Sequence, residues 1–120
     1  MSSIGYPQTG LTADEFYSKS VKEKDAGKRR RLFADARQSN LCIYQIYVFA
    51  AESEEHWKSD IGHIKAILSR GVTVFKNPAG QGAHCPKVSN DTWKQQATDA
   101  ERRGHPKTAT ALREVIDRAS

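Results

Sequence analysis

The sequence predicts an α+β domain, or a small α/β domain, with an N-terminal helical segment, a central strand-helix-strand unit and a C-terminal antiparallel helical hairpin. Two observations predict this class. Residues 41–51 form a run that is apolar on both alternating faces, and segments with helical spacing lie on either side of it. Such a run must be covered on both faces. We therefore expect a buried strand at the centre, with a buried helix as the alternative.

Two helical segments are expected before the run. Thr12 can accept hydrogen bonds from the free backbone amides of a helix that begins at Ala13. Gly27 interrupts the pattern, because glycine either ends a helix in a left-handed conformation or weakens a helix interior. A second segment follows over 28–38, and its apolar face consists of Leu32, Phe33 and Ala36.

The residues after the run predict a helix and then a second strand. Ser53 followed by Glu54 is typical of a helix start, and Gly71 is typical of a helix end. One helical face between them consists of Trp57, Ile61, Ile64 and Leu68. Residues 72–75 then predict a short strand, which gives a strand-helix-strand unit with a right-handed crossover.

Two short strands do not make a stable sheet by themselves. The sheet could be completed by helices on both faces, by a third strand in 83–88 or in the N-terminal tail, or by pairing across a homodimer. We expect helical cover, with a homodimer as a further option.

The C-terminal residues predict two helices that pack against each other. Thr92 and Gln95 match a capping box, Gly104 ends the first helix, and Pro106 can begin the second. The two facing stripes consist of Trp93, Ala97 and Ala100, and of Ala109, Leu112, Ile116 and Ala119. Small residues in both stripes allow close approach, so we expect an antiparallel hairpin.

A chain of 120 residues fits one domain, expected at 11–120 behind a flexible tail at 1–10. No apolar run reaches the roughly 18 residues that a membrane helix needs. Cys42 and Cys85 are too few for a secreted disulfide framework and are typical of a reducing compartment. The first residues lack the pattern of a secretory signal, so we expect a cytoplasmic location.

Basic residues give the chain a formal charge of +5 and a pI near 9.4. More than half of this excess lies within 12–40, where eight Lys or Arg residues oppose five Asp or Glu residues. Positive potential of this kind attracts acidic partners. The strongest binding candidates are Lys28, Arg29, Arg30 and Arg31, with Arg37 and Lys24 as helpers. In the alternative interpretation, Asp25 and Asp35 pair with these arginines on a solvated helix.

These features predict a small, basic, non-enzymatic binding protein that engages an acidic surface, with nucleic acid as the first partner to test. The first alternative is an accessory or inhibitory protein that docks onto another protein, as small products of phages and mobile elements often do. The second alternative is a small-ligand or phosphate-binding enzyme that uses the loop at 77–87.

The 77–87 loop would follow a strand and precede a helix, where α/β folds place ligands. Its candidate anion or ligand contacts are Lys76, Gly80, Gly82, His84 and Lys87. The loop fails the dinucleotide fingerprint because Cys85 replaces the third glycine, and no Gly-Lys-Ser or Gly-Lys-Thr forms a phosphate loop. His84 and Cys85 lack the spacing of a zinc site or of a thiol nucleophile with its base. No catalytic residue, metal or cofactor is predicted.

Overall fold

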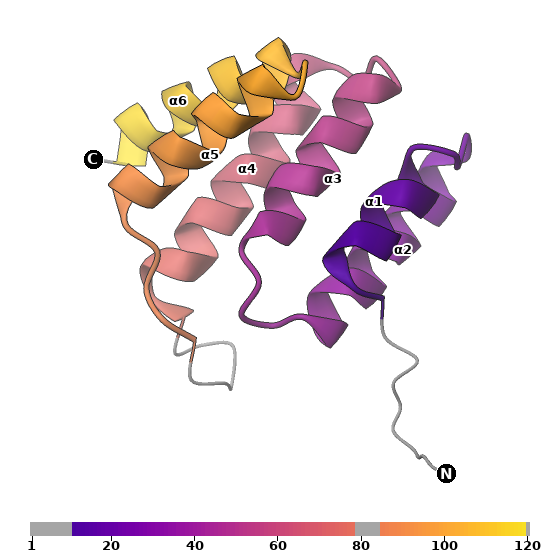
Figure 1. The fold of residues 1–120 in the computed structure, drawn as a ribbon, viewed down its shortest axis with the longest axis horizontal. Helices are drawn as coiled ribbons and strands as arrows, with labels where there is room; N and C mark the ends of the chain where they lie inside the picture. Colours follow the sequence, from indigo (N-terminus) through magenta and orange to yellow (C-terminus); the bar gives the residue numbers. More distant parts are fainter. Residues whose placement is uncertain (1–10, 79–84, 120) are drawn as a thin grey trace, which may run out of the picture.

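The computed structural model describes residues 11–78 and 85–119, and these residues fold into helices without strands (Figure 1). The helices are α1 (Ala13–Ser20), α2 (Ala26–Ser39), α3 (Gln45–His56), α4 (Ile61–Lys76), α5 (Asn90–Arg102) and α6 (Pro106–Ala119). No helix in this part of the chain is both long and apolar enough to cross a membrane.

Helix α3 lies near the centre of the arrangement. The α1–α2 pair packs on one side of α3, and α4 packs on the other side, followed by α6 and α5 (Figure 1). The large part of the core is shared mainly by α3, α4, α5 and α6, and a smaller part lies beneath α1 and α2. The α1–α2 pair is therefore a layer added to a four-helix unit.

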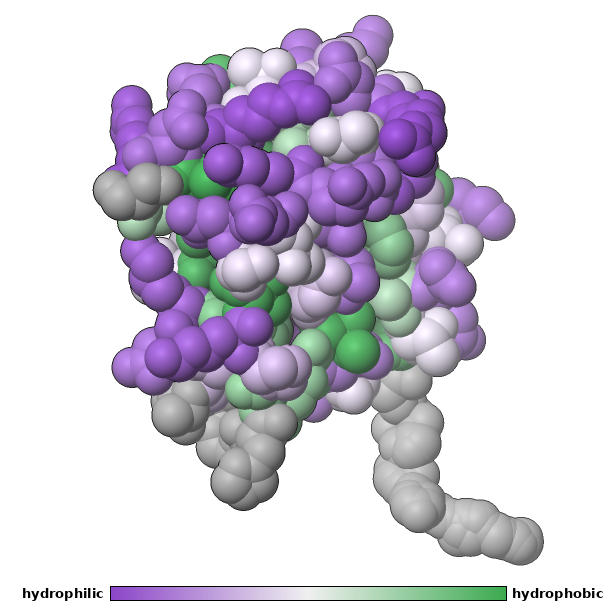
Figure 2. Space-filling model, turned by 60° about the vertical axis from the view of Figure 1, so that its left-hand side comes forward, coloured by the Kyte–Doolittle hydropathy of each residue, from purple (hydrophilic) through white to green (hydrophobic). Residues whose placement is uncertain are grey.

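Figure 2 shows a face of the molecule on which hydrophilic side chains predominate, with smaller hydrophobic areas between them.

The predicted α+β class is wrong, because residues 41–51 do not form a strand. Residues 41–44 form an irregular turn, and α3 begins at Gln45 and continues to His56. The run is apolar on both sides because α3 has neighbouring helices on both sides, and a helix covered in this way loses the pattern of an amphipathic helix. Its buried apolar residues are Ile46, Tyr47, Val48, Ala50 and Ala51.

The second predicted strand, 72–75, lies in the last turns of α4. Gly71 does not end this helix but lies inside it, against the ring of Tyr47. A Cβ atom on Gly71 would lie 2.7 Å from Cγ of Tyr47, so only glycine allows α3 and α4 to approach this closely. The strand-helix-strand unit is absent from the described residues, and with it the sheet edge that suggested a homodimer.

Several helix ends lie where local signals predict them. Thr12 caps α1 and forms a capping box. Pro106 is the first residue of α6, and Gly104 adopts a φ of 91° in the preceding turn. In contrast, Ser53 lies inside α3, and Asp60 caps α4 instead.

The C-terminal helical pair is confirmed. Ser89, rather than Thr92, caps α5 by accepting a hydrogen bond from the Thr92 amide at 3.2 Å. The predicted facing residues are fully buried in both helices, apart from Ala119, which is half-buried. Small residues along the contact let α5 and α6 pack closely.

Cys42 and Cys85 form a disulfide, and their Cα atoms are 5.0 Å apart. The bond joins the segment before α3 to the segment before α5, across a sequence separation of 43. In the chain-entropy description, closing a loop of this length stabilises the fold by about 4 kcal/mol. Disulfides form and persist mainly in oxidising compartments. The pairing therefore disagrees with the expectation of two reduced cysteines.

Candidate anion-binding cleft

Helix α2 distributes the predicted cationic run around its circumference, because successive helical residues are turned by about 100°. Lys28 and Arg31 lie along an outer edge of α2, where they line a shallow, open depression together with Asp35. Arg30 and, seven residues later, Arg37 lie along the other edge and line a deeper cleft. The run therefore does not form one continuous cationic surface.

Arg29 points between these two edges into the protein. It is 7% exposed, and its Nε donates a hydrogen bond to Oε2 of Glu54 at 2.8 Å. Its Nη1 donates to the carbonyl oxygens of Glu23 and of Lys24, whose own side chain is exposed, each at 2.8 Å. The guanidinium also lies 5.2 Å from the ring centroid of Trp57. Arg29 fastens the α1–α2 turn to α3, so it is already fully engaged within the chain.

Glu54 is the acidic member of this network. Burial acts to raise the pKa of its carboxyl group, but hydrogen bonds from Arg29 and Ser59, together with the charge of Arg29, outweigh burial and lower the pKa. The Ser59 hydroxyl donates to Oε1 of Glu54 at 2.6 Å, and Nε2 of His63 lies 3.8 Å from the same oxygen. Glu54 is thus ionised and paired.

The cleft has a volume of about 450 Å³ and lies between the α1–α2 pair and helices α3 and α4. Its apolar floor consists of Phe16, Phe33, Ala50, Ala66 and Ile67. Ligand sites in proteins commonly have volumes of about 300–1,000 Å³ and mostly apolar walls. The cleft is therefore large enough for a bulky side chain or a small organic molecule.

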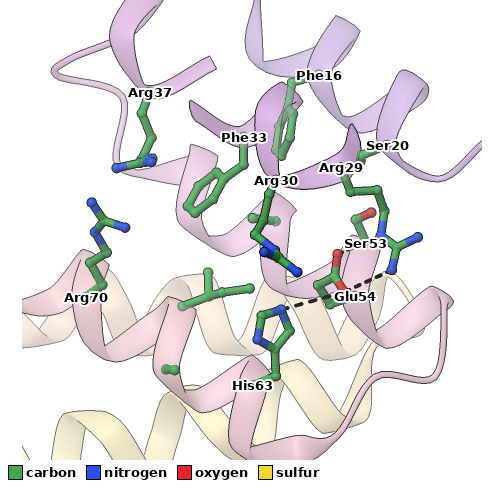
Figure 3. Close-up of a pocket in the computed structure, with 13 residues that line it drawn as sticks. Phe16, Ser20, Arg29, Arg30, Phe33, Arg37, Ser53, Glu54, His63 and Arg70 are labelled. Carbon is green, nitrogen blue, oxygen red and sulfur yellow. Dashed lines mark hydrogen bonds and ion pairs between the residues drawn. The ribbon is translucent and has the colours of Figure 1, made fainter. Parts of the chain in front are cut away.

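Among the described residues that line the cleft, four are arginines and only Glu54 is a carboxylate. Arg29 pairs with Glu54, whereas Arg30, Arg37 and Arg70 form no ion pair with any carboxylate in the described part of the chain. Figure 3 shows Arg37 on α2 and Arg70 on α4 reaching toward the same space from opposite walls. Three uncompensated positive charges around an apolar cleft create a potential that attracts anions.

Two buried polar atoms of the cleft wall lack a hydrogen-bond partner among the residues that the structure describes: Oγ of Ser53 and Nε of Arg37. Ser53 is 1% exposed. The guanidinium of Arg37 is held over the ring of Phe33, 4.7 Å from its centroid. Buried polar groups are nearly always paired. Both atoms are closed off from solvent, so an acidic group bound in the cleft would contact Arg37 through its terminal nitrogens.

The predicted loop contacts do not belong to this cleft. Lys76 is the last residue of α4, and its Nζ donates to the carbonyl oxygen of Ala119 at 2.6 Å, while Lys87 is exposed. Outside the described residues lie Gly80, Gly82 and His84. Cys85 is held in the disulfide and so presents no thiol. The described residues contain no group of three potential metal ligands.

A second polar cluster lies where α1, α3 and the α5–α6 turn meet. Glu52 is 1% exposed and pairs with Arg103 at 2.5 Å. Nε2 of His105 lies 3.2 Å from the hydroxyl of Tyr17, whose pKa is raised by burial and then by the charge of Glu52. Glu55 accepts hydrogen bonds from two backbone amides in the first turn of α6, at 2.8 and 3.1 Å. These groups satisfy one another and hold the helices together.

Arg70 and Ser53 line the cleft but were not predicted as site residues. Arg70 has no sequence signal, because only tertiary packing brings α4 opposite α2. Ser53 was interpreted as a helix cap. Arg30 and Arg37 are seven residues apart, a spacing that places two residues on one helix face. That spacing could have separated them from Lys28 and Arg31 before the fold was known.

Comparisons with protein-family models, with curated proteins and with solved structures find nothing that matches this chain. They assign neither a family nor a function. A functional proposal therefore depends on the volume of the cleft, its apolar floor and its unpaired arginines.

Proposed function

We propose that the protein is a non-enzymatic binding protein that engages an acidic protein surface through the cleft between α2 and α4. One observation carries this proposal: Arg30, Arg37 and Arg70 converge on an apolar cleft, and none of them pairs with a carboxylate in the described residues. The carboxylate and the histidine of the cleft, Glu54 and His63, are already part of the Arg29 network. The groups left for a partner are cationic and apolar.

Two observations favour an acidic protein over nucleic acid. A phosphate backbone needs a row of accessible cations. Arg29 is buried in its pair with Glu54, and Arg30 lies on the opposite edge of α2 from Lys28 and Arg31. The cleft is also floored by apolar side chains, which suit an inserted side chain better than a charged backbone. Docking onto another protein agrees with an accessory or inhibitory role.

The disulfide bears on where such binding takes place. Because Cys42 and Cys85 are paired, we propose that the protein works in an oxidising compartment rather than in the cytoplasm. The test is the thiol content of protein purified from its natural source in the presence of an alkylating agent. Two alkylated cysteines would contradict the proposal, and two protected cysteines are expected.

A binding experiment with defined probes tests the proposed function. The probes are a fluorescent glutamate-rich peptide that contains aromatic residues and a short DNA duplex, and anisotropy is measured over a range of salt concentrations. The cleft variant combines Arg30→Ala, Arg37→Ala and Arg70→Ala. The matched control combines Lys22→Ala, Lys28→Ala and Arg31→Ala, which removes the same charge from the open depression formed by the outer edge of α2 and the α1–α2 turn.

We expect the cleft variant to bind the acidic peptide at least about tenfold more weakly, because each arginine loses a charge-assisted hydrogen bond. The control should retain most of the affinity, and circular dichroism should show that both variants are folded. Equal losses in the two variants, or tighter binding of the DNA duplex through the outer edge, would contradict the proposed function.

A further inference from the structure

We infer that the cleft accepts a short acidic segment of the partner protein that inserts one large apolar side chain between the arginines. This inference rests on the proposed function, since it specifies which part of an acidic partner enters the cleft. It goes further because a surface that carries carboxylates but no apolar side chain would leave the floor of the cleft unused.

The floor of the cleft is the first argument. Phe16, at 1% exposure, and Phe33 stack with ring centroids 6.0 Å apart, and Ile67 from α4 completes a surface of aromatic and aliphatic atoms. Covering apolar surface with an apolar group is favourable, whereas a solvated carboxylate gains nothing there. The floor therefore selects an aromatic or a large aliphatic side chain.

The position of the arginines is the second argument. Arg37 and Arg70 stand on opposite walls, and Arg30 lies nearer to Glu54 (Figure 3). A side chain inserted between these walls brings the residues that flank it in the partner sequence to the guanidinium groups. Carboxylates directly before and after the inserted side chain can then pair with arginines on both sides, with good directional geometry.

The fixed position of Arg37 is the third argument. Its guanidinium is held over the ring of Phe33, 4.7 Å from the ring centroid, so it is ordered before a ligand arrives. Nε of Arg37 is closed off from solvent, which leaves the terminal nitrogens to meet an acceptor. A carboxylate can accept hydrogen bonds from both terminal nitrogens of one guanidinium at the same time. The ordered guanidinium therefore favours a carboxylate next to the inserted side chain.

The volume limits the occupant to one such side chain. A space of about 450 Å³ has the size of a small-ligand site and not of a groove for a whole helix. One hot-spot residue surrounded by charged contacts is also a common arrangement in protein interfaces. The occupant is therefore a segment in which carboxylates flank a single aromatic or large aliphatic residue.

The experiment compares four peptides by fluorescence anisotropy with the full chain. The first has a central phenylalanine flanked by glutamates, the second has alanine in its place, and the third has the phenylalanine moved beyond a glycine-serine spacer. The fourth keeps the phenylalanine but replaces each glutamate by glutamine. Free 3-phenylpropionate is the small-molecule arm.

Two protein variants complete the design. Ala66→Trp places a large ring at an exposed position of α4 that lines the cleft, so that it narrows the cleft without removing a charge. Thr110→Trp introduces the same residue at an exposed position on α6, outside the cleft, and is the matched control. The Arg30, Arg37 and Arg70 alanine variant reports on the charged contacts.

The first peptide should bind about 10- to 100-fold more tightly than the alanine and spacer peptides, because burial of one large apolar side chain is worth that factor. Ala66→Trp should abolish this preference, and Thr110→Trp should leave it intact. The glutamine peptide should bind weakly to every variant. Free 3-phenylpropionate should bind much more weakly than the first peptide.

The outcomes separate the two proposals. If the alanine peptide binds as tightly as the phenylalanine peptide while the arginine variant binds neither, this inference is wrong and the proposed function stands. If no acidic peptide binds, or if the arginine variant binds them all like the wild type, the proposed function fails as well. Binding of 3-phenylpropionate as tight as that of the peptide would assign the cleft to a small organic acid and overturn the inference.

Discussion

The two edges of α2 carry similar cations in very different surroundings. On the outer edge, Lys28 and Arg31 line an open depression with an acidic neighbour, Asp35. On the inner edge, Arg30 and Arg37 meet Arg70 from α4 above an apolar floor. Charges that face bulk water and salt are screened, whereas charges beside low-dielectric walls retain their field. A cationic run in a sequence therefore indicates an acidic partner but does not identify which of its residues bind it.

The disulfide joins two segments outside α2, and its loss should have the largest effect on stability without favouring either edge. Cys42→Ser with Cys85→Ser should reduce the free energy of unfolding by about 4 kcal/mol, because the unfolded chain regains the freedom of a long loop. Urea denaturation measures the change. The ratio of peptide affinities between the cleft variant and the outer-edge control should not change, and unaltered stability after reduction would contradict a structural role for the bond.

Arg29 separates the two edges, and its removal should have the next largest effect. Arg29→Ala leaves the partly buried Glu54 without its main partner, so the free energy of unfolding should fall by about 3 kcal/mol. Arg31→Ala, on the outer edge, is the control and should change it by less than about 0.5 kcal/mol. Similar effects of the two substitutions would show that Arg29 is not the internal residue described above.

Gly71 follows Arg70 on α4, so the contact of Gly71 with Tyr47 affects where Arg70 lies in the cleft. Gly71→Ala should destabilise the fold by about 2 kcal/mol, because the new methyl group overlaps the ring of Tyr47 and α4 must shift from α3. Gly27→Ala is the comparison: its Cβ would lie 3.1 Å from Oδ1 of Asp25, an exposed side chain that caps α2 and can shift, so the loss should stay below about 1 kcal/mol. Peptide affinity should fall with the first substitution only. Equal stability of both variants would contradict the close packing of α3 and α4.

Acid should lower the free energy of unfolding by protonating Glu54, the partner of Arg29. Its pKa is lowered in the folded protein, so its contribution to stability is complete above the ordinary value of 4.5 and is lost as the pH falls through the lower folded value. The contribution is smaller than that of the whole Arg29 side chain, because Arg29 also donates to the carbonyl oxygens of Glu23 and Lys24. The difference in unfolding free energy between wild type and Glu54→Gln should shrink below pH 4.5. A constant difference across that range would contradict the assigned ion pair.

Local chemistry predicted the parts of this fold that depend on neighbouring residues. Thr12 and Pro106 mark helix starts because each acts on the backbone within one turn. The central run could not be assigned in this way, since burial on both sides removes the periodic difference between helix and strand. The prediction that Gly71 ends a helix is wrong for a related reason. This glycine is needed for the close contact between α3 and α4, not for a turn.

The candidate site was predictable only in part. Arg30 and Arg37 share a helix face by their spacing, and the basic excess around α2 is visible in the composition. The burial of Arg29 could not be predicted, because its partner Glu54 lies 25 residues away on α3. The sequence assigns the first part of α3 to a strand and its last turn to the start of another helix. The opposition of α4 to α2, which brings Arg70 to the cleft, follows from tertiary packing.

The arginine side chains themselves provide the most direct test of which edge of α2 binds. Nuclear magnetic resonance resolves the Nε–H signals of arginines, and the protein is titrated with the peptide in which glutamates flank a phenylalanine. The signals of Arg37 and Arg70 should shift together and saturate at one affinity, while that of Arg31 stays in place. Saturating shifts of Arg31 with unmoved signals of Arg37 and Arg70 would contradict the assignment of binding to the cleft.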